Sequence, residues 1–256
     1  MLYCLYYSPC GSTQEYAVKV AETLGPNPIY VDLTRSDGRL DFQREDIVIF
    51  AAPVYGGRLP VPLVEKLERM RGDLSHVITM VVYGNRAYDD ALLELNSILV
   101  GDGFEVFASA AFVARHVFHP EVAADRPDKQ DFQEAEAFAN RAKYKYDEMD
   151  YSEPKVPGSK PYREFAGMQV APIADPASCF KCGTCATNCP VGAISKEDPT
   201  QTDALKCIDC MRCVQNCPSQ GRVLPQKVQE MLLAKLSPLA GVRKANEFRS
   251  EERRVG

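Results

Sequence analysis

The chain has 256 residues, enough for one large domain or two smaller ones, and its 45% hydrophobic and 25% charged content is ordinary for a globular protein. Its net charge is −5, and most of the acidic excess precedes residue 178, which argues against nucleic acid as a partner. No apolar run approaches the ~18 residues that a membrane span needs. The first residues lack the pattern of a secretory signal, so we expect a cytoplasmic protein with reduced thiols.

The first 147 residues alternate between predicted strands and helices. Apolar runs predict strands at 2–7, 29–33, 46–52, 76–84 and 104–114, and helical periodicity predicts helices between them and a last one over 128–147. This alternation predicts an α/β domain with a five-stranded, doubly wound parallel sheet. Ligands on such sheets bind beyond the carboxyl ends of the strands.

Three loops rich in small and polar residues are expected at that edge: 8–13, 53–60 and 84–90. The first precedes a helix, so its backbone N–H groups and hydroxyls could bind a phosphate dianion without lysine or arginine. A plain N-capped turn would give the same pattern. Because the chain has no tryptophan, Tyr55 and Tyr88 are the loop residues that could stack on a planar ring, or they could simply be half-buried. No G-x-G-x-x-G follows the first strand, which argues against a dinucleotide site of the Rossmann kind.

Eight of the ten cysteines lie in two copies of the motif C-x2-C-x2-C-x3-C-P, 28 residues apart. The copies are Cys179, Cys182, Cys185 and Cys189 before Pro190, and Cys207, Cys210, Cys213 and Cys217 before Pro218. Structural zinc normally uses two separated C-x2-C pairs, so a third cysteine and a proline in each run fit zinc poorly. Disulfides would need an oxidising compartment.

The cysteine spacing is similar to that of bacterial ferredoxins, which bind two 4Fe–4S clusters. In that family the fourth cysteine of each run serves the other cluster, because the proline directs the chain away from its own. The resemblance therefore implies one cluster on Cys179, Cys182, Cys185 and Cys217, and a second on Cys207, Cys210, Cys213 and Cys189.

The loop 8–13 resembles the flavodoxin phosphate loop, with Cys10 where a hydroxyl residue is usual. Together with the other two loops it resembles a family in which a flavodoxin-like domain is fused to a ferredoxin domain. That resemblance implies a backbone flip at Gly56-Gly57 beside the flavin and a hydrogen bond from Asn85 to the ring edge, although Asn85 could instead cap the next helix. The implied FMN-binding residues are Ser8, Cys10, Gly11, Ser12, Thr13, Pro53, Val54, Tyr55, Gly56, Gly57, Gly84, Asn85, Arg86 and Tyr88.

The remaining candidate ligands outside these motifs are few. His116 and His119 form H-x2-H with no third metal ligand near in sequence, which favours packing or surface roles. Cys4 lies in the first predicted strand, where a cysteine acts as a small buried hydrophobe.

The predicted layout is a flavodoxin-like domain at 1–147, a proline-rich linker at 148–167, a small α+β ferredoxin-like domain at 168–224, and a C-terminal helix and tail at 225–256. The ferredoxin-like domain is expected to begin with a strand over 168–173. The expected function is electron transfer between FMN and two 4Fe–4S clusters, with redox proteins as partners. Two alternatives stay open: an FMN-dependent reductase of a small substrate fed by the clusters, and a redox sensor with clusters but no flavin, supported only by Cys10.

Overall fold

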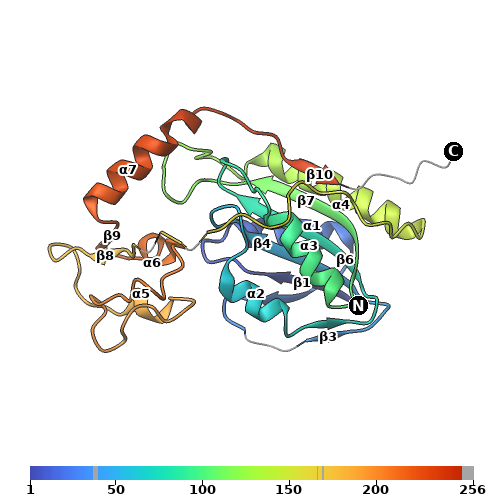
Figure 1. Ribbon diagram of the computed structural model, residues 1–256, viewed down its shortest axis with the longest axis horizontal. Helices are drawn as coiled ribbons and strands as arrows, with labels where there is room; N and C mark the ends of the chain where they lie inside the picture. Colours follow the sequence, from blue (N-terminus) through green and yellow to red (C-terminus); the bar gives the residue numbers. More distant parts are fainter. Residues whose placement is uncertain (37–39, 166, 169, 250–256) are drawn as a thin grey trace.

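The computed structural model describes residues 1–36, 40–165, 167–168 and 170–249, arranged as an α/β domain and a small cysteine-rich domain (Figure 1). Residues 250–256 of the predicted C-terminal tail lie outside the described residues. The elements are β1 (Leu2–Tyr6), α1 (Ser12–Leu24), β2 (Ile29–Asp32), β3 (Asp41–Phe42), β4 (Ile47–Pro53), α2 (Val61–Leu67), β5 (Arg71–Gly72), β6 (His76–Tyr83), α3 (Ala91–Gly101), β7 (Glu105–Val113), α4 (Lys129–Asp147), β8 (Ile173–Ala174), α5 (Thr184–Thr187), α6 (Arg212–Gln215), β9 (Arg222–Val223), α7 (Gln226–Leu236), η1 (Ser237–Leu239) and β10 (Glu247–Arg249).

The central sheet has the strand order β10-β7-β6-β4-β1-β2. The strands β2, β1, β4, β6 and β7 run parallel, which confirms the predicted five-stranded, doubly wound sheet. The chain changes its winding direction between β1 and β4, the position where ligands bind in this topology. The edge strand β10, which the sequence did not predict, pairs antiparallel with β7.

Helices cover both faces of this sheet. One hydrophobic core lies under α2 and α3, and the other lies under α1 and α4. Successive residues of a strand point to opposite faces, so Leu5 belongs to the first core and Cys4 to the second. Cys4 is fully buried, as predicted. Burial on both faces explains why the strands are continuous apolar runs.

The cysteine-rich domain consists of two loop-and-helix units, ending in α5 and α6, and the antiparallel pair of β8 and β9. The strand predicted over 168–173 is shorter than expected, since β8 begins only at Ile173 and Gln169 lies outside the described residues. Met168 N–H donates to the Asp209 carboxylate at 2.7 Å instead of joining a ladder, and Pro172 has no N–H to donate.

The proline-rich segment before β8 lies along the α/β domain. The N–H groups of Ser159 and Arg163 donate to the two carboxylate oxygens of Asp90, at 2.9 and 2.7 Å. The Arg58 guanidinium donates to the Arg163 carbonyl at 2.8 Å and lies 4.8 Å from the centre of the Tyr162 ring. These contacts fix the connector on the domain that precedes it.

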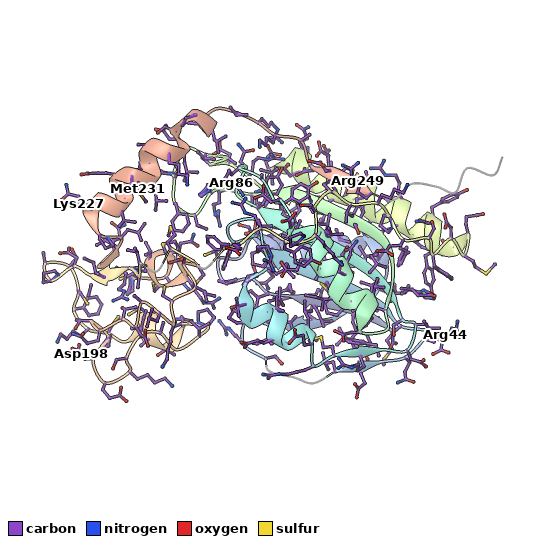
Figure 2. All side chains as sticks on the ribbon, viewed as in Figure 1. Arg44, Arg86, Asp198, Lys227, Met231 and Arg249 are labelled. Carbon is purple, nitrogen blue, oxygen red and sulfur yellow. The ribbon has the colours of Figure 1, made fainter. Side chains whose placement is uncertain are left out.

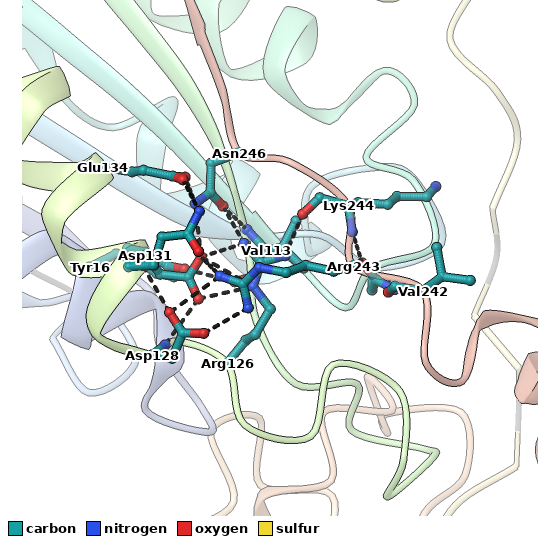
Figure 3. Close-up of polar contacts among 12 residues, drawn as sticks. Tyr16, Val113, Arg126, Asp128, Asp131, Glu134, Val242, Arg243, Lys244 and Asn246 are labelled. Atoms are coloured by element: carbon teal, nitrogen blue, oxygen red, sulfur yellow. Dashed lines mark hydrogen bonds and ion pairs between the residues drawn. The ribbon is translucent and has the colours of Figure 1, made fainter.

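After α7 the chain returns to the α/β domain and adds β10 to its sheet (Figure 1). Figure 3 shows the polar contacts of this return. The Asn246 side chain accepts from Val113 N–H at 2.8 Å and donates to Asp131 at 2.9 Å. Asp131 is fully buried in an ion pair with Arg126, itself 4% exposed. The cysteine-rich domain is therefore held to the α/β domain by the connector at one end and by this return at the other. Among the described residues, no helix combines the length and apolarity needed to cross a membrane.

Candidate functional site

A cavity of about 250 Å³ lies where the carboxyl ends of the strands meet the cysteine-rich domain. It is located at the winding change of the sheet, the place that the topology favours for a ligand. The residues of the three predicted loops that line it are Ser8, Pro9, Cys10, Ser12, Thr13, Pro53, Val54, Tyr55, Gly56, Gly57, Gly84, Arg86 and Ala87. The fold thus brings all three loops around one space.

The loop 8–13 forms one end of this cavity at the start of α1. The Ser8 hydroxyl oxygen accepts from Gln14 N–H at 3.0 Å, which leaves its O–H free to donate to a ligand. Gly11, which does not line the cavity, makes the turn into the helix with φ of 93°. The helix begins at Ser12, so the N–H groups of its first turn have no partners within the helix. This end of the cavity is suited to an anion.

The loop after β4 turns tightly at two glycines. Tyr55 and Arg58 exchange backbone hydrogen bonds of 2.9 and 3.1 Å. Gly56 and Gly57 between them have φ of 59° and 90°, and such a turn with two positive φ values favours glycine at both positions. The turn places Tyr55 in the cavity wall, where burial holds the pKa of its phenol well above the ordinary value.

Besides Gly11, two predicted site residues, Asn85 and Tyr88, do not line the cavity, and their side chains have other partners. The Asn85 side chain is fully buried and donates to the Val242 carbonyl at 2.7 Å, so it holds the returning C-terminal segment. Tyr88 packs against Tyr83 with the two rings tilted and donates to the Glu247 carboxylate at 2.8 Å. Both side chains bind the C-terminal segment that includes β10. This contact is long-range, so the local sequence could not predict it.

Other cavity walls come from outside the three predicted loops, and they include His116, for which the sequence favoured a packing or surface role. They are Arg115, His116, Val117 and Phe118 after β7, Phe165 and Met168 of the connector, Asp209, and Leu232, Lys235 and Leu236 of α7. The segment after β7 lies at the same edge of the sheet as the predicted loops. Its position in the predicted topology could therefore have identified it as part of the site. Burial lowers the pKa of His116 to about 4, so its imidazole is neutral at neutral pH. Its Nδ1 accepts from Phe118 N–H at 3.2 Å.

The eight motif cysteines surround two further hollows in the cysteine-rich domain. One hollow is lined by Cys179, Cys182, Cys185 and Cys217, and the other by Cys189, Cys207, Cys210 and Cys213. Each hollow therefore receives three cysteines from one motif and the fourth from the other motif. This grouping equals the two ligand sets that the ferredoxin resemblance implies.

A buried arginine lies beside both cysteine sets. Arg222 is 1% exposed and donates to the Pro199 carbonyl at 3.2 Å and to the Thr202 hydroxyl at 2.5 Å. Burial raises the pKa of Cys185 and of Cys213, and the Arg222 guanidinium opposes both rises. It thus favours the thiolate form that metal ligation requires. Because Arg222 stands alone after the second motif, no sequence pattern predicted this role.

The second cysteine motif touches the loop 8–13 directly. The Cys10 thiol donates to the Cys210 carbonyl at 2.8 Å, and the Arg212 guanidinium donates to the Pro9 carbonyl at 2.9 Å. The first motif is more open, because Cys182 is exposed and the Phe180 side chain is 64% exposed. The cavity and the two cysteine-lined hollows therefore lie in a series, which runs from the α/β domain to an exposed loop of the small domain.

Comparison with protein families identifies both parts of the chain. A model described as a flavodoxin domain matches residues 3–91, and a model described as a 4Fe–4S dicluster domain matches residues 177–223. The chain joins a flavodoxin domain to a 4Fe–4S dicluster domain. This confirms the predicted fusion and assigns the protein to electron transfer, with flavin and 4Fe–4S clusters as the cofactors that these domains imply. Both matched ranges lie inside the domains predicted at 1–147 and 168–224, whose bounds stay predictions.

Solved flavodoxin structures are similar to a part of the chain. A Streptococcus pneumonia TIGR4 flavodoxin is 18% identical, covering 56% of this chain and 98% of its own, with a TM-score of 0.42. Flavodoxin 1 from Bacillus cereus is 16% identical, covering 57% of this chain and 97% of its own, with a TM-score of 0.40. No curated protein matches the chain.

Proposed function

We propose that the chain relays electrons between FMN, bound in the cavity of the flavodoxin domain, and two 4Fe–4S clusters bound by the crossed cysteine sets. The observation that carries this proposal is the direct contact of the second cysteine motif with the phosphate loop, from Cys10 to Cys210 and from Pro9 to Arg212. FMN exchanges electrons singly or in pairs, and each cluster exchanges one electron. A protein that holds both cofactors can therefore convert between one-electron and two-electron transfer.

The cavity residues fit FMN. The start of α1 and the hydroxyls of Ser8, Ser12 and Thr13 offer donors to the phosphate, and Tyr55 offers an aromatic face to the ring. Arg115 also lines the cavity and its charge acts on Cys10, so a cation from outside the loop supports phosphate binding. No local sequence pattern predicted this cation.

The cysteine sets fit 4Fe–4S clusters, which are held by four thiolates each. We name the cluster on Cys189, Cys207, Cys210 and Cys213 proximal, because its loop touches the flavodoxin domain, and the cluster on Cys179, Cys182, Cys185 and Cys217 distal. Arg222 lies beside both sets and would compensate part of their negative charge. Reduced thiols of this kind are consistent with the cytoplasmic location expected from the sequence.

The proposed order of transfer is distal cluster, proximal cluster, flavin. The distal loop carries the exposed Phe180 and Cys182, so a redox partner protein would exchange electrons there. The proximal loop is buried against the flavodoxin domain, where Cys210 is 8% exposed. Electrons from the partner would then reach the flavin only through both clusters.

An anaerobic titration of the full chain with dithionite tests the proposal. The protein should contain about eight irons, eight sulfides and one FMN, and both the cluster and the flavin absorbance should bleach. Iron without flavin would contradict the relay and favour the sensor alternative. Turnover of a small substrate at the flavin would favour the reductase alternative instead.

A further inference from the structure

We propose that Asp209, a residue of the cysteine-rich domain, completes the flavin site by accepting a hydrogen bond from an N–H group of the flavin ring. This inference rests on the proposed function, because it assumes that FMN occupies the cavity. It assigns a flavin ligand to the 4Fe–4S domain, so that neither domain alone would form the whole site.

Asp209 lines the cavity although it belongs to the proximal cysteine loop. The residue is 7% exposed, and its Oδ2 accepts from Met168 N–H at 2.7 Å. Within the described part of the chain, Oδ1 is buried and has no hydrogen-bond partner. A buried carboxylate oxygen without a partner is costly, and a ligand donor in the cavity would remove that cost.

The internal repeat shows that the cluster loop itself does not require this burial. Lys181 occupies the position equivalent to Asp209 in the first motif, and both have the left-handed backbone, with φ of 57° and 58°. The Lys181 side chain is 63% exposed and lies 3.6 Å from Asp198. The same loop conformation therefore leaves one residue in solvent and directs the other to the cavity that Tyr55 also lines.

Hydrogen-bonding chemistry favours the flavin ring, and not the phosphate, as the partner of Asp209. An ionised carboxylate only accepts hydrogen bonds and repels a phosphate dianion, whereas the flavin ring carries N–H donors. The phosphate has its own donors at the start of α1. Met168 fixes one oxygen of Asp209, and the other is left for the ring. Because Asp209 stands between Cys207 and Cys210, one short loop would hold both the proximal cluster and the flavin.

The test compares wild-type protein, Asp209→Asn and Asp198→Asn, each as the full chain with clusters assembled. Asp198→Asn is the matched control, since it removes the same charge from the same domain at a position remote from the flavodoxin domain (Figure 2). FMN affinity is measured by fluorescence titration, and the ring N–H vibrations are measured with ¹⁵N-labelled FMN. Asp209→Asn should weaken FMN binding about tenfold or more, the range for losing a hydrogen bond to a charged group.

The vibrational measurement separates ligand contact from a purely structural role. Asp209→Asn should shift an N–H band of bound FMN, and Asp198→Asn should leave both the band and the affinity unchanged. If FMN binds Asp209→Asn with wild-type affinity and an unchanged band, Asp209 serves only to anchor Met168 and the inference is wrong. A wild-type chain that binds no FMN would instead overturn the proposed function together with this inference.

Discussion

The thiol of Cys10 donates a hydrogen bond of 2.8 Å to the backbone carbonyl of Cys210, between residues 200 positions apart in sequence. Cys10 stands in the proposed phosphate loop 8–13, at the position where the flavodoxin resemblance implies a hydroxyl residue. Burial raises the pKa of the Cys10 thiol to about 12, so it is protonated at neutral pH and can donate. The thiol therefore forms a contact between the two domains.

Replacing Cys10 should weaken this contact without preventing cofactor binding. Cys10→Ala removes the donor to Cys210 and should lower the free energy of unfolding by about 1 kcal/mol. It should also slow electron exchange between the flavin and the clusters, measured by rapid-mixing absorbance after reduction. Cys10→Ser keeps a donor and should behave like wild type. Equal exchange rates in Cys10→Ala and wild type would show that the contact does not serve transfer.

The fourth cysteines should act on the cluster of the opposite motif. Cys189→Ala should impair the proximal cluster, and Cys217→Ala should impair the distal one, because each completes the other motif's hollow. Iron analysis and EPR of each variant check the assignment. Cys4→Ala is the control, since this thiol lies in the flavodoxin core and should leave the iron content unchanged. Loss of the cluster of the same motif would contradict the crossed sets.

The two loop tyrosines should differ in their effect on FMN. Tyr55→Ala removes a wall of the cavity and should weaken FMN binding about tenfold, as expected for loss of an aromatic contact. Tyr88→Phe removes only the hydrogen bond to Glu247 and should keep the FMN affinity while lowering stability by about 1 kcal/mol. Fluorescence titration and denaturant unfolding measure the two quantities. The opposite pattern would place Tyr88, and not Tyr55, at the ring.

The C-terminal return should contribute strongly to stability. Asn246→Ala leaves Val113 N–H without its acceptor and takes a partner from the buried Asp131, so it should cost about 1–3 kcal/mol. Lys143→Ala breaks an exposed ion pair with Asp147 on α4 and should cost about 0.5 kcal/mol or less. Unfolding in denaturant compares them. Equal costs would mean that the return is only loosely attached.

His116 should make stability depend on pH. Its folded pKa of about 4, set mainly by burial and further by His119 and Arg86, lies below the unfolded value of about 6.5. The unfolded chain therefore binds the extra proton first, and stability falls as the pH drops from 6.5 toward 4. At about pH 5.5 the loss should be about 1.2 kcal/mol relative to pH 7. His116→Asn, which keeps an acceptor for Phe118 N–H, should lose less over this interval in denaturant unfolding; an identical loss would exclude His116 as the cause.

Local sequence patterns predicted the helices and strands whose formation depends on residues close together in the chain. The apolar runs of β4 and β6 and the periodicity of α4 placed these elements within a few residues of their observed bounds. The predicted strand at 168–173 was too long because the N–H of Met168 binds a side chain 41 residues away. No local pattern contains such a partner.

The sequence by itself determined the parallel sheet, the loops at its carboxyl edge and the two cysteine motifs, because hydrophobic period, turn residues and ligand spacing are local properties. Only the tertiary structure decided which residues share one space. In the structure Asn85 and Tyr88 lie outside the cavity, whereas Asp209, Phe165 and His116 line it. The Cys10 thiol donates a hydrogen bond to the Cys210 carbonyl. These arrangements follow from packing between segments far apart in the chain, and those of Asn85 and Tyr88 depend on the return of the C-terminal segment to β7.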